Sequence, residues 1–329
     1  MVIDNMIKQL KVFVLIFTGL LPGVSIFAQS YLERNEVQDF IQEMVAKRDF
    51  DEAHLKSVID GAVFKQSIID AISKPAEKVL TWKQYRKIFL TERRIELGRK
   101  FIHKHRDTLL RAEKSYGVPT HIVAAIIGVE TLYGQRMGNY RVLDSLATLA
   151  FDYPPRASFF RRQLEEFLLL SREEQQDEFD LMGSYAGAMG FGQFIPSSYR
   201  VYAVDFDADG VRDIWTNPVD AIGSVANYLS EHGWRKGQPI ATMVSPESQE
   251  GKELFGNKLK PYISVGQLVE NGTLRDIRLE ADQKVSPLLF NGRKGEEYWL
   301  GLYNFYVITR YNHSKLYALA VYQLSRELM

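Results

Sequence analysis

The segment Ile122–Val129 is apolar at every position except for one glycine, and it ends in a single acidic residue, Glu130. It follows the turn-forming Gly117–Thr120, so the sequence predicts a helix from His121 to Glu130. A helix that is apolar on all its faces must be buried, and it needs neighbours all around it. With 329 residues the chain is long enough to supply them. We therefore expect a layered helical core around this segment.

The composition is that of a globular protein, with 46% apolar and 25% charged residues. The chain has no cysteine, which excludes thiol catalysis, disulfide scaffolds and cysteine-based zinc sites. Lys plus Arg and Asp plus Glu both number 41, so the net charge is +0. A neutral chain has no general positive field that attracts nucleic acid, and we expect no nucleic-acid partner.

Residues 1–28 have the pattern of a secretory signal peptide. Lys8 and Lys11 precede the apolar run Val12–Leu21, and Ala28 offers a small residue at a cleavage point. The apolar run has about ten residues, which is short against the ~20 that span a bilayer. We expect export with removal of this segment. The alternative is that the segment is retained as a membrane anchor.

Apolar residues at three- and four-residue spacing predict helices over most of the remaining chain. The expected helical segments are Val37–Val45, Thr91–Leu109, Phe159–Ser171, Pro218–His232 and Ser314–Leu328. Short β-prone pieces between Gly237 and Gly295, such as Tyr262–Val265 and Ser286–Phe290, predict a small strand-rich insertion. The predicted fold class is mainly α (α+β), with a small antiparallel β insertion.

Glu130 has apolar and aromatic neighbours on both sides in the sequence. Loss of water disfavours the charged form of a carboxyl group, so such surroundings raise its pKa. A raised pKa suits a general acid, which must keep its proton near neutral pH and deliver it to a leaving oxygen. The alternative is a glutamate at a helix end with its carboxylate in solvent.

The segment Gly183–Phe194 is rich in glycine and aromatic residues, and it contains Ser184 and Gln193. It matches neither a dinucleotide-binding nor a phosphate-loop pattern, so phosphate binding is disfavoured. Glycines at this density allow a ligand to lie against the backbone, while the two polar side chains can bind hydroxyl or acetamido groups of a sugar. The alternative is a close packing contact that uses small residues.

An acidic loop, residues 205–213, resembles the start of an EF-hand. Asp205, Asp207 and Asp209 stand at positions 1, 3 and 5, glycine stands at position 6, and Val211 can offer its backbone carbonyl at position 7. Such oxygen ligands suit Ca²⁺ better than Mg²⁺. Position 12 is Thr216 rather than the expected glutamate. The alternative is a solvated turn that binds no metal.

Several long motifs in the same order resemble those of the lytic murein transglycosylase B family, from about Trp82 to the C-terminus. The motifs are Ile127–Thr131, Tyr153–Pro154, Gly183–Tyr199 and Asn304–Asn312. The resemblance implies a lysozyme-like helical core. Together with the residue patterns described above, it divides the chain into a signal peptide (1–28), an N-terminal helical region (29–114), a catalytic core (115–236) with the EF-hand-like loop, a β-rich insertion (237–296) and a C-terminal segment that completes the cleft (297–329).

By this resemblance Glu130 is the lone catalytic acid/base that cleaves the β-1,4 bond between N-acetylmuramic acid and N-acetylglucosamine in peptidoglycan. Most glycosidases need a second carboxylate. A lytic transglycosylase replaces it with the C6 hydroxyl of the muramic acid, which attacks the anomeric carbon and yields a 1,6-anhydro sugar. A non-catalytic peptidoglycan-binding scaffold and a lysozyme-type hydrolase on the same fold are the alternatives.

The resemblance also implies which residues bind the glycan. They are Tyr85, Arg156, Ser184, Gln193, Tyr228, Tyr311, Asn312 and Tyr317. The family usually has two arginines after Tyr-Pro, where this chain has Pro155 and Arg156, so only the second arginine is carried over.

The resemblance further implies that Asp220 closes the loop around a structural Ca²⁺, and no organic cofactor is expected. The expected partners are peptidoglycan strands and other cell-wall enzymes. We expect a monomer in the periplasm of a Gram-negative bacterium.

Overall fold

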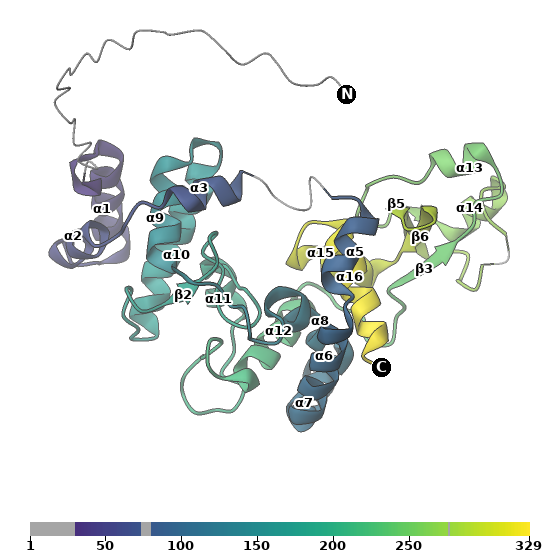
Figure 1. Ribbon diagram of the computed structural model, residues 1–329, viewed down its shortest axis with the longest axis horizontal. Coiled ribbons are helices and arrows are strands. Elements are labelled where there is room, and N and C mark those ends of the chain that lie inside the picture. Colours follow the sequence, from purple (N-terminus) through teal and green to yellow (C-terminus); the bar gives the residue numbers. More distant parts are fainter. Residues whose placement is uncertain (1–29, 74–79, 276) are drawn as a thin grey trace, which may run out of the picture.

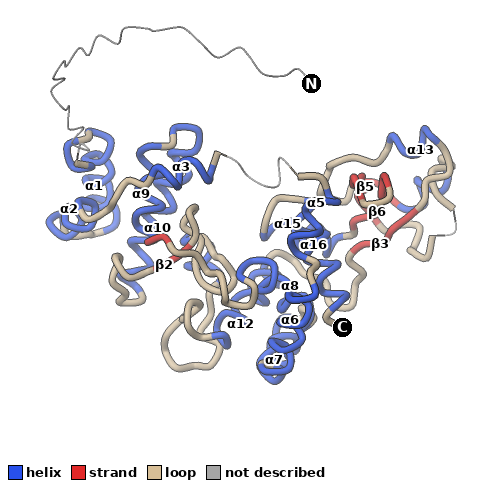
Figure 2. Tube along the Cα trace, viewed as in Figure 1, coloured by secondary structure: helices blue, strands red, loops and turns tan. Residues whose placement is uncertain are grey.

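The computed structural model describes residues 30–73, 80–275 and 277–329 (Figure 1). The expected signal peptide therefore lies outside the described residues. Among the helices that are described, none is both long and apolar enough to cross a membrane. Helices dominate the described chain and most of the strand residues gather at one end, which confirms the predicted fold class (Figure 2).

The first part of the chain is helical, as predicted. Its elements are η1 (Tyr31–Glu33), α1 (Asn35–Arg48), α2 (Glu52–Asp60), α3 (Gln66–Ile72), α5 (Trp82–Phe89), α6 (Glu92–Lys104) and α7 (Arg106–Tyr116). The predicted single helix Thr91–Leu109 is wrong in one respect. His105 leaves the helical conformation, with φ −110° and ψ 25°, and separates α6 from α7.

The all-apolar segment forms α8 (Thr120–Thr131), and every residue from Ile122 to Val129 is buried. Four helices pack around it: α6, α7, α12 (Pro218–Glu231) and α16 (Lys315–Glu327) (Figure 1). This arrangement explains why α8 has no polar face, because no side of it meets water.

A second helical layer consists of α9 (Val142–Asp152), η2 (Pro154–Arg156), α10 (Ala157–Glu173) and α11 (Pro196–Tyr202). The predicted inner face of α10, from Phe160 to Leu168, is buried as expected. Two short antiparallel strands, β1 (Tyr140–Arg141) and β2 (Met182–Gly183), join this layer to the start of the glycine-rich segment.

The predicted insertion forms a four-stranded antiparallel sheet with the order β3-β6-β5-β4. Its elements are β3 (Ala241–Val244), α13 (Gln249–Glu253), β4 (Ile263–Ser264), α14 (Val265–Glu270), β5 (Lys284–Gly292) and β6 (Gly295–Gly301). β6 continues past residue 296, where the sequence placed the end of the insertion. The predicted strand Tyr262–Val265 is shorter than expected, because Ser264 and Gln267 form a capping box that starts α14.

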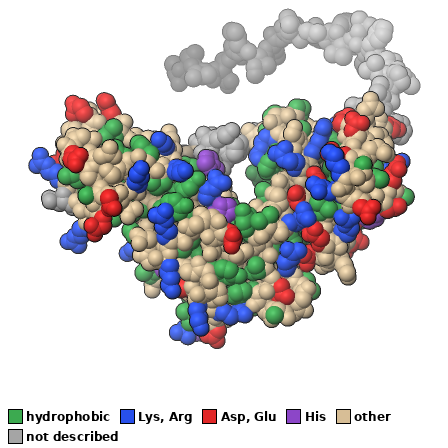
Figure 3. Space-filling view, turned by 180° about the vertical axis from the view of Figure 1, so that it is seen from behind, with side chains coloured by type: hydrophobic (Ala, Val, Ile, Leu, Met, Phe, Trp, Pro, Cys, Tyr) green, Lys and Arg blue, Asp and Glu red, His purple; other side chains and the backbone are tan. Residues whose placement is uncertain are grey.

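The insertion has a small core of its own, which includes Phe255, Leu268 and Leu300. It meets the helical body through α5 and β5, where the rings of Trp82 and Phe290 pack edge to face with centroids 5.9 Å apart. After the sheet the chain returns to the body as α15 (Tyr303–Tyr311) and α16. Seen from behind, the surface is hollowed between the insertion and the lobe of the N-terminal helices (Figure 3).

Candidate active site

Glu130 is half-buried at the penultimate position of α8. The helix ends there because Leu132 and Tyr133 both adopt left-handed backbone angles, with φ of 52° and 60°. Thr131 is fully buried, and its Oγ1 lies 2.9 Å from the carbonyl oxygen of Phe191 in the glycine-rich segment. The end of α8 is thereby fixed against that segment, which sets the position of the Glu130 carboxyl group.

Tyr317, in the first turn of α16, donates a hydrogen bond from its hydroxyl to Oε1 of Glu130 at 2.6 Å. The two residues are 187 positions apart in the sequence. Tyr317 is only 2% exposed. Burial, followed by the nearby Glu130 charge, raises the pKa of the Tyr317 hydroxyl well above its usual value. Tyr317 therefore stays protonated and can act as a donor that orients the carboxyl group.

Tyr311 lies beside this pair. Its ring is nearly parallel to that of Tyr317, with an interplanar angle of 8° and centroids 6.3 Å apart. Its hydroxyl donates to the carbonyl of Gly192 at 2.5 Å. Burial raises the pKa of Tyr311 well above its usual value, and the charge of Glu130 contributes further. One wall of the site is thus made of two tyrosines held by the body of the protein.

Tyr228 and Tyr85, both predicted to bind the glycan, are buried next to this wall. Tyr228 packs against Tyr311 with ring centroids 4.7 Å apart, and its hydroxyl donates to the carbonyl of Arg310 at 2.6 Å. Tyr85 is 1% exposed and contributes to the electrostatic environment of Tyr317. Tyr228 thus packs against one tyrosine of the wall, and Tyr85 lies near the other.

The glycine-rich segment folds into a tight loop in which the glycines make room for the protein's own atoms. A Cβ on Gly183 would lie 2.4 Å from the carbonyl oxygen of Ala188, and a Cβ on Gly192 would lie 2.8 Å from the Tyr311 hydroxyl oxygen. Ser184 Oγ accepts the backbone N–H groups of Ala186 and Ala188. The close-packing alternative therefore accounts for these glycines.

Gln193 belongs to the same loop and adopts a left-handed backbone conformation, with φ of 52°. Its Nε2 donates to the carbonyl oxygens of Met137 and Gly190, at 3.1 and 3.0 Å. The side chain of Gln193 thus holds the loop against the segment that follows α8.

Arg156 and Asn312 lie together elsewhere, on the wall of a cavity of about 1120 Å³. Glu130 does not line this cavity, but Ser314, Lys315 and Leu316 do, and they directly precede Tyr317 in the chain. The predicted binding residues thus divide into a cluster around Glu130, a loop next to it and two residues on the neighbouring cavity.

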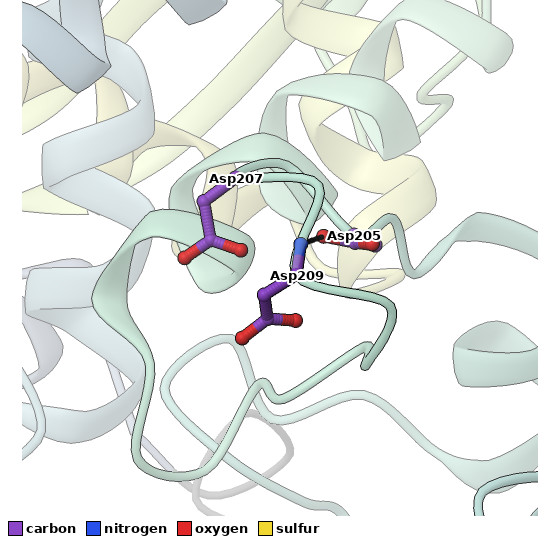
Figure 4. A group of neighbouring side chains, drawn as sticks. All are labelled: Asp205, Asp207 and Asp209. Carbon is purple, nitrogen blue, oxygen red and sulfur yellow. Dashed lines mark hydrogen bonds between the residues drawn. The ribbon is translucent and has the colours of Figure 1, made fainter.

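The acidic loop brings three carboxylates together. One carboxylate oxygen from each of Asp205, Asp207 and Asp209 lies within 4.8 Å of the others (Figure 4). Three like charges this close repel one another, and a divalent cation would relieve the repulsion. Asp205 accepts three backbone N–H groups of the loop, which lowers its pKa and keeps it ionised. The donor set therefore fits a hard cation.

Asp220 is fully buried below the loop, at the start of α12. Its two oxygens accept the backbone N–H groups of Phe206 at 2.7 Å and Asp213 at 2.9 Å. Burial raises its pKa. Asp220 thus ties both sides of the loop to α12, and it stands apart from the three clustered carboxylates.

With this geometry in place, comparison with known proteins is informative. The family model of the transglycosylase SLT domain (SLT_2) matches residues 32–326, almost the whole described chain. The chain belongs to the SLT_2 family. It is 44% identical over 298 residues to the membrane-bound lytic murein transglycosylase B of Escherichia coli, a match that covers 88% of this chain and 81% of the relative.

Two solved structures resemble this SLT_2 enzyme closely. The soluble lytic transglycosylase SltB1 of Pseudomonas aeruginosa has a TM-score of 0.85 and 52% identity, over 89% of this chain and 98% of that one. The E. coli lytic transglycosylase Slt35, in a structure that contains calcium, has a TM-score of 0.83 and 44% identity, over 91% of this chain and 94% of that one.

Sequence reasoning missed Arg94, a buried cation at the end of α8. Arg94 is 7% exposed, and its Nε donates to the carbonyl of Gly128 at 2.9 Å, two residues before Glu130. A cation is favourable at this end of α8 because of the helix dipole. The sequence held one signal for it. Arg94, Gly98 and Phe101 have the spacing of residues on the buried face of a helix, so Arg94 could have been predicted to be buried.

Proposed function

We propose that this SLT_2 enzyme cleaves the β-1,4 bond between N-acetylmuramic acid and N-acetylglucosamine in peptidoglycan, with Glu130 as its single acid/base and a 1,6-anhydro sugar as product. One observation carries the proposal. The half-buried carboxyl group of Glu130, at the end of a buried helix, accepts a 2.6 Å hydrogen bond from Tyr317, one of the two tyrosines of the wall. The names of the lytic transglycosylases that resemble it agree with this reaction.

In the proposed reaction Glu130 first gives its proton to the glycosidic oxygen, and the bond between that oxygen and the anomeric carbon of the muramic acid breaks. The C6 hydroxyl of the same sugar attacks the anomeric carbon and forms the new C–O bond. Its proton passes to Glu130, which is thereby ready for the next cycle. No water is consumed, and no second carboxylate is needed to activate one.

The tyrosines have separate tasks in this proposal. Tyr317 holds the carboxyl group of Glu130 in one orientation, and Tyr311 offers an aromatic surface to a sugar ring. Tyr228 and Tyr85 keep the wall in place from behind. Ser184, Gln193, Arg156 and Asn312 line the path of the glycan on either side of the bond that is cut.

We also propose a structural Ca²⁺ held by Asp205, Asp207 and Asp209 with the carbonyl of Val211. Asp220 supports the site from α12, because its carboxylate accepts backbone N–H groups from both sides of the loop. The calcium-containing structure of E. coli Slt35 supports this choice of ion. The ion neutralises the clustered carboxylates and supplies no step of the reaction.

The proposal extends to location. Because residues 1–28 have the pattern of a signal peptide, we infer that the enzyme is exported to the periplasm, where peptidoglycan is found. Cell fractionation and N-terminal sequencing of the recovered protein test this inference. A protein recovered in the cytoplasm with its N-terminus intact contradicts it.

The decisive experiment uses purified sacculi and mass spectrometry of the released fragments. The wild-type enzyme is expected to release 1,6-anhydro ends, whereas Glu130→Gln releases none and still binds sacculi. Glu96→Gln, which changes an exposed glutamate on α6, is the matched control and is expected to retain full activity. Reducing ends in place of anhydro ends would identify a hydrolase. Binding without release by the wild type would identify a scaffold.

A further inference from the structure

A pocket of about 320 Å³ lies between α6 and α7, at the end of α8 that is far from the active site. Thr120, the first residue of α8, lines this pocket, whereas Glu130 is the penultimate residue of the same helix. At about 1.5 Å per residue, the helix separates the two by about 15 Å. α6 and α7 lie at one edge of the molecule, apart from the sheet and from the lobe of the N-terminal helices (Figure 1). A ligand in this pocket would therefore leave the active site open.

The pocket is basic. Residues 99–106 include four Lys and Arg, two His and no acidic residue, in a chain whose net charge is +0. Arg99, His103 and Arg106 line the pocket and are exposed, and none of the lining residues is acidic. Within the described chain, none of these three side chains forms an ion pair with a carboxylate. Arg99 donates to the backbone carbonyl of Glu327, at 3.1 Å, and so still carries an unpaired charge.

Two more lysines extend the positive charge along α6. Lys104 is exposed and forms no ion pair in the described chain, whereas Lys100 is paired with Glu96 at 2.6 Å. Lys100 therefore adds little to the local charge, and Arg99, Lys104 and Arg106 are the cations that a partner would meet. We call the surface formed by these three residues, His103 and Leu110 the basic face.

The same pocket has an apolar part. Ile102, Leu109 and Leu328 line it together with the cations, and Leu110 lines it as well. Leu110 is 44% exposed, although a large apolar side chain on a helix is usually turned inward. A small anion alone would have no use for an exposed leucine. A partner that presents negative charge next to apolar surface would contact both parts.

The sequence spacing builds this face. Arg99, His103, Arg106 and Leu110 follow one another at intervals of four, three and four residues, which places them on one side of a helix. His105 interrupts the helix between α6 and α7, and yet all four side chains line the same pocket. The basic face is thus a continuous feature of both helices.

We propose that the basic face binds the surface of a bilayer that contains anionic phospholipids, with lipid phosphates on Arg99 and Arg106 and Leu110 inserted beside them. Guanidinium groups bind phosphate oxygens in pairs, and cations near an anionic membrane add to its attraction. An apolar side chain next to such cations gains from burial at the interface of the bilayer. Charge complementarity and the exposed leucine together favour this partner over a free anion.

The arrangement orients the bound enzyme. A bilayer on the basic face lies at the start of α8, and the Glu130 carboxyl group lies at its other end. The active site therefore stays accessible to a long polymer while the protein is held at the membrane. Binding of this kind needs neither turnover nor peptidoglycan, so it is tested independently of the proposed reaction.

The test is co-sedimentation of the full chain with vesicles made of equal parts phosphatidylglycerol and phosphatidylcholine, compared with vesicles of phosphatidylcholine alone. We expect the wild type to bind the anionic vesicles about a hundredfold more tightly, since Arg99, Lys104 and Arg106 each contribute about fivefold. High salt is expected to remove most of this difference. A retained N-terminal segment is common to the wild type and its variants, and it cannot produce a difference between them.

Arg99→Gln/Arg106→Gln is expected to weaken binding to the anionic vesicles about twenty-five-fold and to leave binding to the neutral vesicles within about twofold. Arg278→Gln/Arg293→Gln is the matched control, since both arginines are exposed and neither lines the pocket. It is expected to bind as the wild type does. Equal binding of the wild type to both kinds of vesicle overturns the proposal, as does a pocket variant that binds the anionic vesicles like the wild type.

Two further measurements separate a lipid surface from a free anion. Leu110→Ser, at an exposed position, is expected to weaken binding to the anionic vesicles about threefold to fivefold and to leave its salt dependence unchanged. Inorganic phosphate is expected to compete no better than chloride at the same ionic strength. Unchanged binding of Leu110→Ser, or specific competition by phosphate, overturns the assignment to a bilayer. The wild-type comparisons need no variant and hold even if one of the variants folds poorly.

Discussion

The hydrogen bond between Tyr317 and Glu130 is the residue-scale contact on which we expect activity to depend most. Replacing Tyr317 by Phe removes one hydrogen bond to an ionisable group, worth about 1.5–3 kcal/mol, and we expect kcat to fall about tenfold to a hundredfold. Tyr322→Phe changes a tyrosine further along the same helix and is expected to leave kcat within about twofold. Steady-state turnover of soluble strands measures both. An unchanged kcat for Tyr317→Phe contradicts the orienting role.

Lys315 gives the stability of the protein a dependence on pH. Burial lowers its pKa to about 8, so the ammonium group loses its proton as the pH rises from about 7 to 9. The unfolded chain binds this proton up to its usual pKa of 10.5, so Lys315 makes the free energy of unfolding rise with pH between about 8 and 10.5.

Lys315→Met is the comparison for this effect. Its free energy of unfolding is expected to change less with pH between about 8 and 10.5, because the variant lacks the buried amine. Chemical denaturation at a series of pH values provides the measurement. Curves of the wild type and the variant that stay parallel would contradict the prediction.

Individual site residues were predicted from the sequence more completely than their contacts. Glu130 was predicted from its apolar surroundings, and Tyr317 from the family resemblance. Their hydrogen bond was not predicted, because nothing in the spacing of two residues 187 positions apart shows that α8 and α16 are neighbours.

At the scale of elements, α6 and α8 approach each other around the ring of Tyr133. A Cβ on Gly128 would lie 2.5 Å from the Tyr133 hydroxyl oxygen, and a Cβ on Gly98 would lie 2.2 Å from the same atom. The absence of a side chain at Gly128 thus makes room inside the helix. The ring of Tyr133, which follows α8, folds back into this space.

Gly128→Ala is therefore expected to destabilise the protein, in spite of the better helix propensity of alanine. Overpacking of this kind costs about 1–3 kcal/mol, against a gain of about 1 kcal/mol from propensity. Gly256→Ala is the control, because a Cβ there has no atom within 4 Å. Chemical denaturation gives the free energies of unfolding. A Gly128→Ala variant as stable as the wild type would show that Tyr133 moves aside freely.

Helices were predicted well from periodicity, because a buried face repeats every three or four residues whatever it packs against. The breaks within helical stretches were not predicted. The split at His105 depends on backbone angles that no residue of the Thr91–Leu109 stretch signals, neither glycine nor proline being present at the break. Likewise, the residues of β4 are β-prone, but Ser264 starts a helix as soon as the strand pairing ends.

At the scale of the whole molecule, the acidic loop connects α11, which follows the glycine-rich segment, to α12, and α12 packs against α8. A bound Ca²⁺ would hold these parts together. At a concentration one hundred times its Kd, Ca²⁺ is expected to add about 2.7 kcal/mol to the free energy of unfolding. EDTA should accordingly lower the melting temperature more than it lowers activity measured well below that temperature.

Calorimetry and thermal melts with Asp207→Ala/Asp209→Ala check the metal site. The variant is expected to lose both Ca²⁺ binding and the Ca²⁺-dependent rise in melting temperature. Asp39→Ala/Asp282→Ala removes the same charge from two exposed sites outside the loop and should keep both. Retained Ca²⁺ affinity in the loop variant would exclude this loop as the site.

The packing of α8 against α16 has a consequence for the synthesis of the enzyme. The acidic loop, α12 and the whole sheet lie between these two helices in the sequence. They are therefore synthesised after Glu130 and before Tyr317, the residue proposed to align it. A nascent or truncated chain that stops short of α16 carries the acid without its aligning partner. We therefore expect little wall-cutting activity from a chain that ends before α16.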